Sequence, residues 1–266
     1  MKLRTYIVIV AFYLLGLASC QSKLEEPVTP DYQGLQVLTD QILESTVLGK
    51  TVHYNVLLPT GTDIMTDGAF PVLYLLHGLT EDHTMWMSHT KVQQYLDLAI
   101  RTGMIPPMAV VMPEAFATFY IGDYDRFFET EFIPAVRKQY NLSSDRKHNF
   151  IMGNSMGGYG AFYHAFTYPE RFRFCYSICP AADANTPKII ANYKEAHGSF
   201  DGLPDLVFIR NEDDWLCGPM DDILQNGMDA VGFPYTFFMR PGWHCSTVDQ
   251  EIREVWNYIG AYYDLQ

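Results

Sequence analysis

The sequence predicts an α/β fold with a mostly parallel central sheet and helices on both faces. Apolar runs such as PVLYLLHG (71–78) and HNFIMG (148–153) are continuous rather than alternating, as expected of strands covered on both faces. Segments with apolar residues at helical spacing, such as 90–101 and 249–263, lie between or after these runs. The chain has 266 residues, of which 48% are hydrophobic, and this suits one larger globular domain.

The N-terminus is typical of a bacterial export signal. Lys2 and Arg4 precede an apolar stretch at 6–17 that is too short for a comfortable membrane-spanning helix. The stretch is followed by Ala18-Ser19-Cys20, which resembles a lipobox, where the cysteine is lipidated and becomes the new N-terminus. We expect residues 1–19 to be a lipoprotein signal peptide and Cys20 to hold the protein to the bacterial envelope, on its periplasmic or surface face.

A tether and one folded domain are expected after the lipid anchor. Residues 20–34 are polar with two prolines and indicate a tether, and 35–266 form the folded domain, which opens with strands around a Gly49-Lys50 turn. Further strands are expected at 71–78, 108–114, 148–153, 174–180, 205–214 and 234–244, and helices at 90–101, 123–140, 157–172 and 249–263. Only about 25 residues separate the strands at 174–180 and 205–214, so any lid there is small or absent.

The formal net charge of −13 and the lack of a basic run argue against a nucleic-acid partner. The acidity is read as a solvated surface. The cysteines lack the spacing of metal ligands, and no histidines cluster near them in the sequence. Neither a metal nor a cofactor is therefore expected. The oligomeric state is left open.

A polar cluster at a strand end carries the chemistry. Gly153-Asn154-Ser155-Met156-Gly157 matches G-x-S-x-G between an expected strand and an expected helix, the context that this motif requires. A sharp strand-to-helix turn leaves no room for side chains two positions to either side of the serine. Ser155 is therefore the predicted nucleophile. The amide of Met156 and the amide of Leu79, in the loop after YLLHG, are the predicted oxyanion donors.

Ser155 needs a base, and His244 is the predicted one. It follows an expected strand and ends the turn Pro241-Gly242-Trp243-His244, so it can project over the sheet edge. His164 is expected to pack within the helix after the serine, and His197 to lie on the surface. His77 precedes the serine and would break the chain order of serine, acid and histidine that α/β-hydrolases follow.

The acid that orients the histidine is expected at the end of the strand at 205–214. The sequence offers Glu212, Asp213 and Asp214 there, and physical reasoning leaves the two aspartates open with Glu212 as a third choice.

Several motifs together resemble the esterase-D-like branch of the α/β-hydrolases. They are PVLYLLHGLTEDHTMW, MAVVMPE, FIMGNSMGGYGAF, NEDDWL and PGWH, spread over roughly residues 40–263. The branch includes S-formylglutathione hydrolases, tributyrin-type esterases, and feruloyl and acetyl-xylan esterases. The resemblance implies a Ser–Asp–His triad without a metal. The family acid usually falls three residues after a glycine; Arg210 stands in the glycine position here, and the spacing favours Asp213.

These residues predict a serine carboxylesterase. Ser155 would attack an ester, and Asp213 and His244 would assist it. An exported member suggests acetyl or feruloyl esters of carbohydrates outside the cytoplasm, whereas formylglutathione is a cytosolic substrate. An acyltransferase that uses the same triad is the first alternative. A catalytically inactive, glycan-binding hydrolase-like lipoprotein is the second.

Cysteine positions add one further expectation. Cys217 and Cys245 lie within four residues of Asp213 and His244, whose side chains must touch in a triad. The two cysteines are therefore candidates for a disulfide, which a Cα separation above about 7 Å would exclude. Free buried thiols are the alternative. A pair between Cys175 and Cys179 is disfavoured, because residues four apart in a strand are distant.

Overall fold

The computed structural model describes residues 31–61 and 68–263, so the predicted signal peptide and Cys20 lie outside the described residues. The strands are β1 (Tyr32–Ser45), β2 (Lys50–Gly61), β3 (Val72–Leu76), β4 (Ala109–Pro113), β5 (Asn149–Asn154), β6 (Phe174–Ile178), β7 (Asp205–Asn211) and β8 (Thr236–Arg240). The helices are α1 (Met85–His89), α2 (Val92–Arg101), α3 (Asp123–Phe127), α4 (Ile133–Tyr140), α5 (Met156–Thr167), α6 (Thr186–His197), α7 (Gly218–Val231) and α8 (Val248–Gly260). A π-helical turn, η1 (Phe128–Phe132), joins α3 to α4, and a 3-10 turn, η2 (Arg146–His148), precedes β5.

All the described strands form one sheet, in the order β1-β2-β4-β3-β5-β6-β7-β8. β1 and β2 are an antiparallel hairpin and β2 pairs antiparallel with β4, whereas every pair from β4 to β8 is parallel. This confirms the predicted mostly parallel sheet. The strand order changes direction between β3 and β5, and such a switch point leaves a crevice at the carboxyl ends of the strands.

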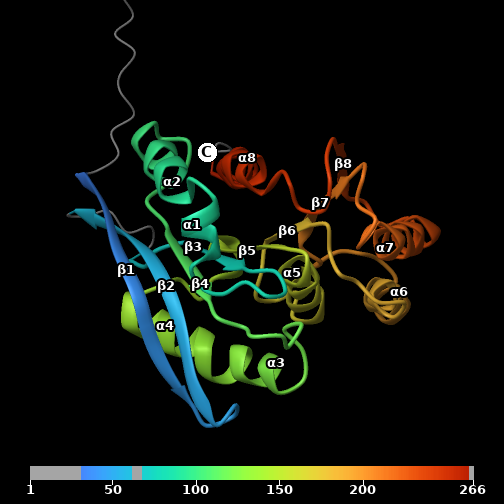
Figure 1. Ribbon diagram of the computed structural model, residues 1–266, viewed down its shortest axis with the longest axis horizontal. Helices are drawn as coiled ribbons and strands as arrows, with labels where there is room; N and C mark the ends of the chain where they lie inside the picture. The colour runs from blue at the N-terminus through green and yellow to red at the C-terminus, as the bar shows by residue number, and fades with distance from the viewer. Residues whose placement is uncertain (1–30, 62–67, 264–266) are drawn as a thin grey trace, which may run out of the picture.

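Helices cover both faces of the sheet (Figure 1), which confirms the predicted layers. α1, α2 and α8 pack on one face, and α3 to α7 pack on the other. Leu73 and Tyr74 of β3 are neighbours in sequence but belong to opposite buried clusters. Because side chains alternate across a strand, a sheet with two covered faces needs apolar residues at every position. The continuous runs in the sequence have this origin.

Three of the described helices, the short α1 and the longer α6 and α7, were not predicted. The last two are adjacent in the fold. They pack against each other beside β7, and Gly227 of α7 lies against Pro187 of α6. Only Thr186 and Ile190 of α6 are buried, so its apolar periodicity is faint in the sequence. β1 begins at Tyr32, three residues before the predicted start of the domain. None of the helices described is both long and apolar enough to cross a membrane.

Candidate active site

Ser155 lies at a sharp turn between β5 and α5. Its backbone has φ 53° and ψ −117°, a conformation that is uncommon for a residue with a side chain. The Ser155 amide donates to the carbonyl of Ile178 (2.8 Å), and the Ser155 carbonyl accepts from the amide of Ala181 (3.0 Å). These bonds to β6 and the segment after it hold the strained turn, so the serine stands at the carboxyl edge of the sheet.

The flanking glycines are required by close backbone contacts. A Cβ on Gly153 would lie 2.1 Å from the carbonyl oxygen of Gly157. A Cβ on Gly157 would lie 2.2 Å from the carbonyl oxygen of Leu76 in β3. Both distances are far below van der Waals contact, which supports the predicted steric role of the two glycines.

A chain of hydrogen bonds joins Ser155, His244 and Asp214. Ser155 Oγ lies 2.8 Å from His244 Nε2, and His244 Nδ1 lies 2.6 Å from Asp214 Oδ2. The other carboxylate oxygen, Oδ1, accepts the backbone amides of Leu216 (3.0 Å) and Cys217 (2.8 Å). A carboxylate on Nδ1 holds the proton there and leaves the Nε2 lone pair directed at the serine.

The choice of Asp213 as the acid is wrong, because Asp214 is the residue that contacts His244. Asp214 is buried, whereas Asp213 is exposed and uses its backbone amide to bind the carbonyl of Gly242 (3.0 Å). That bond joins the loop after β7 to the loop after β8, and it leaves Asp214 facing inward. Arg210, in the position of the family glycine, bonds Gln225 of α7 through Nη1 (2.9 Å).

The three other candidate histidines have partners elsewhere or lie on the surface. His164 is fully buried in α5, with Nε2 3.0 Å from the carbonyl of Tyr120, which confirms that it packs there. His197 is exposed, as predicted. His77 Nε2 accepts the amide of Ala115 (2.9 Å), so its Nδ1 donates to the carbonyl of Gly78 (2.7 Å).

A pocket of about 640 Å³ opens onto Ser155 and His244, and both predicted oxyanion residues line it. Met156 is the first residue of α5, where a backbone N–H has no acceptor within the helix. Leu79 lies in the loop after β3, across the crevice from the start of α5. The structure therefore brings Leu79 and Met156 to the serine, while their part in catalysis stays a prediction.

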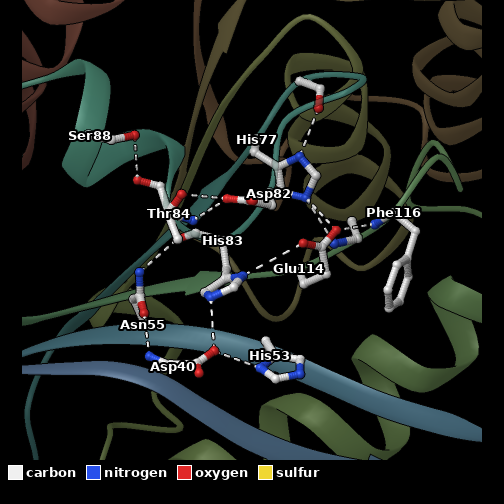
Figure 2. A network of polar contacts seen from close by, with 12 residues as sticks. Asp40, His53, Asn55, His77, Asp82, His83, Thr84, Ser88, Glu114 and Phe116 are labelled. Atoms are coloured by element: carbon white, nitrogen blue, oxygen red, sulfur yellow. Dashed lines mark hydrogen bonds and ion pairs between the residues drawn. The ribbon is translucent and has the colours of Figure 1, made fainter.

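The loop that carries Leu79 is braced by a polar network (Figure 2). Glu114 Oε1 accepts the backbone amide of Phe116 (2.6 Å), and Glu114 Oε2 lies 3.7 Å from His83 Nδ1. His83 in turn approaches Asp40 of β1, at 3.4 Å. On the side of the serine, Glu81 Oε2 accepts the amide of Gly78 (2.6 Å) and the side chain of Asn154 (3.1 Å). Sequence reasoning did not identify Glu81 or Glu114 as parts of the site.

Cys217 and Cys245 approach the same histidine but do not pair. All four cysteines in the described part are free, so the pairing that was considered is wrong. Their sulfurs lie 4.0 Å and 3.6 Å from His244 Nε2. Burial, with the negative charge of Asp214 nearby, raises the pKa of the Cys217 thiol to about 12.

Asp221 of α7 is a buried carboxyl group behind the site. Neither of its oxygens has a hydrogen-bond partner among the described residues, and the nearest cation, Arg210 Nε, lies 3.9 Å away. Burial, together with the nearby Cys179, Asp214 and Asp222, raises the pKa of Asp221 to about 10 against the opposing effect of Arg210. Asp221 is therefore neutral in the folded protein at pH 7.

Replacing Asp221 by asparagine should flatten the pH dependence of stability. The unfolded chain releases the Asp221 proton near pH 4, whereas the folded protein keeps it until about pH 10. The wild type should therefore lose stability as pH rises through this window, by up to about 1.4 kcal/mol per pH unit from this group. Urea unfolding of both proteins at pH 5 and pH 8 measures the effect. Parallel pH curves for the two proteins would contradict it.

Comparison with known proteins shows the family to which the chain belongs. Residues 45–216 match the family model described as "Putative esterase". An endo-1,4-beta-xylanase/feruloyl esterase of Xylanibacter ruminicola is 33% identical over 138 residues, which are 47% of this chain and 19% of that protein. An acetyl esterase of Caldicellulosiruptor saccharolyticus is 28% identical over 138 residues, 48% of each chain. The chain thus spans about half the length of these relatives, or less.

Solved structures share the fold over most of the chain. The structure of a ferulic acid esterase superposes with a TM-score of 0.75 at 23% identity, and covers 86% of this chain and 99% of its own. The predicted resemblance to esterase-D-like proteins is confirmed: the chain belongs to this esterase family and has the α/β-hydrolase fold.

Proposed function

We propose that the protein is a serine carboxylesterase that acts through an acyl-enzyme. The observation that carries the proposal is the hydrogen-bonded chain from Ser155 Oγ through His244 to Asp214, with separations of 2.8 Å and 2.6 Å. The family match and the pocket at the serine support it. A complete and connected set of these three groups argues against a scaffold that only binds glycans.

The proposed mechanism follows from the geometry. His244 Nε2 takes the hydroxyl proton as Ser155 Oγ attacks the ester carbonyl, and Asp214 stabilises the imidazolium that forms. The amides of Leu79 and Met156 bind the developing oxyanion. His244 then protonates the departing alcohol. Water, activated by the same imidazole, hydrolyses the acyl-enzyme and restores the serine.

The substrate class that we propose is acyl esters of carbohydrates, with acetate or ferulate as the acyl group. Relatives that are named feruloyl and acetyl esterases support this. The surface next to the triad supports it too. Trp215, which follows Asp214, has 80% of its surface exposed, and Trp243, which precedes His244, has 66% exposed. Exposed aromatic groups beside a catalytic site are characteristic of ligand-binding surfaces.

Replacing Trp243 by alanine should affect large substrates more than small ones. Trp243 lines a second hollow beside Ser155, where a sugar ring could pack against the indole. We expect kcat/KM for an acetylated or feruloylated polysaccharide to fall about tenfold, the equivalent of about 1.4 kcal/mol of binding. Turnover of p-nitrophenyl acetate should change little. An equal loss on both substrates would instead indicate a disturbed His244.

The proposal is tested by trapping Ser155 with a fluorophosphonate and locating the modified peptide by mass spectrometry. We expect one adduct per chain on Ser155 and none on the Ser155→Ala variant, together with turnover of at least one of acetyl-xylan, methyl ferulate and short triglycerides. Labelling of another residue, or equal ester turnover by Ser155→Ala, would refute the assignment. Acyl transfer to added glycan that outpaces hydrolysis would identify the protein as an acyltransferase.

We also propose that the protein is exported and anchored by a lipid on Cys20, on the strength of the sequence motif at residues 17–20. Growth of an expressing bacterium with radiolabelled palmitate tests this. The full chain should take up label and partition with the envelope, and Cys20→Ala should do neither. An unlabelled full chain would contradict the proposal.

A further inference from the structure

Three thiols surround the imidazole of His244. Cys179 follows β6, Cys217 immediately precedes α7, and Cys245 is the next residue after the histidine. Cys245 Sγ lies 3.6 Å and Cys217 Sγ lies 4.0 Å from His244 Nε2. The donor atoms of Cys179, His244 and Cys245 all lie within 4.8 Å of one another. Loops from three different strands thus bring sulfur and nitrogen donors to one point.

His244 and Cys245 have the donor spacing of a tetrahedral zinc site. Zinc binds thiolate sulfur at about 2.3 Å and imidazole nitrogen at about 2.0 Å, which places the two donors about 3.6 Å apart. The separation of His244 Nε2 from Cys245 Sγ equals that value, and the separation from Cys217 Sγ exceeds it by a few tenths of an ångström. Soft thiolates together with imidazole favour zinc, cadmium and similar ions over magnesium and calcium.

The surroundings hold these donors in place. Asp214 binds Nδ1 of His244 and so presents Nε2 as the donor, the arrangement of carboxylate and histidine that is common behind zinc ligands. Cys179 Sγ lies 2.9 Å from Asn211 Oδ1 and is fully buried. Cys179 and Cys245 both have a positive φ, 41° and 53°, so the backbone is held in an uncommon conformation at each thiol.

We propose that a thiophilic divalent cation of the zinc and cadmium class binds His244 Nε2, Cys179 Sγ and Cys245 Sγ. Each thiol that binds releases its proton to solvent as its metal–sulfur bond forms, and nothing is oxidised or reduced. The ion occupies the Nε2 lone pair that otherwise accepts the hydrogen bond from Ser155. Bound metal and an active base therefore exclude each other, and the ion is an inhibitor rather than a cofactor.

Cadmium titration of the reduced full chain under anaerobic conditions tests the binding. We expect the ultraviolet charge-transfer band of cadmium thiolate to saturate at one ion per chain. Cys245→Ser and Cys179→Ser should each weaken binding by at least about tenfold and reduce the band. Cys175→Ser is the matched control, because Cys175 is an equally buried free thiol in β6 that belongs to the core on the other face of the sheet. It should leave the titration unchanged.

The inhibitory part rests on the proposed esterase function, and the binding part does not. Ser155→Ala lacks the nucleophile but should still give the cadmium band, so a failure of the esterase assignment leaves the band intact. In the wild type, ester turnover should fall in step with the band and return with a chelator. A missing band, or one that both Cys245→Ser and Cys179→Ser retain in full, would overturn the proposal. Recovery by a thiol reductant but not by a chelator would also overturn it, and would indicate a disulfide.

Discussion

Asp214→Asn is expected to lower kcat for ester hydrolysis by about 10⁴-fold. Asparagine keeps the shape of the side chain but presents no charge to His244, and its amide group favours the tautomer with the proton on Nε2. In that tautomer the histidine cannot accept the proton of Ser155. The effect should be large in kcat and small in KM, because Asp214 Oδ2 binds His244 Nδ1 rather than lining the pocket.

Asp213→Asn is the matched control, since it makes the same change one residue earlier. Asp213 is exposed, and its structural bond to Gly242 comes from the backbone amide, which the substitution retains. We expect its kcat to stay within about twofold of the wild type. The assignment of Asp214 fails if Asp213→Asn is the more damaging of the two. Steady-state kinetics on p-nitrophenyl acetate distinguishes the outcomes.

Gly157→Ala is expected to destabilise the protein by about 4 kcal/mol or more. The new Cβ would lie 2.2 Å from the carbonyl oxygen of Leu76 and 2.6 Å from that of His77. Both are backbone atoms of β3 and the loop after it, so neither can rotate away. The only relief is a shift of α5 away from the sheet, which moves Ser155 and the amide of Met156. Activity of the remaining folded protein should therefore fall at least about 10²-fold.

Gly218→Ala provides the control for that substitution. Gly218 begins α7, and a Cβ there would meet nothing within 4 Å. Alanine should be neutral, or stabilising by up to about 1 kcal/mol, because glycine is a poor helix residue. Chemical unfolding measures both variants. Similar unfolding curves for Gly157→Ala and the wild type would show that the close approach of α5 to β3 is absent in solution.

The sheet could be predicted because its physical requirement is local. A strand buried on both faces needs an unbroken apolar run, so β3, β4, β5 and β6 are all visible in the sequence. α7 and α6 were missed for a different reason. α6 buries little of its surface, and its packing partner is another helix whose position depends on the whole fold.

The same contrast between local and long-range requirements applies to the active site. Gly153, Ser155 and Gly157 could be identified because one turn contains both the nucleophile and the reason for its glycines. The choice between Asp213 and Asp214 could not be made in this way. Neighbouring residues in a turn point in different directions, and the bond from the Asp213 amide to Gly242, on a distant loop, decides which of them faces inward.

The positions of the thiols around His244 also depend partly on contacts between distant loops. Cys217 and Cys245 could be expected near each other, because each is a few residues from a triad member. Cys179 lies after another strand, and only the pairing of β6 with β7 brings it beside Asn211 and the histidine. Short-range sequence patterns thus specify the strands, the serine turn and the histidine. Which acid and which thiols meet that histidine depends on contacts between loops that are far apart in the chain.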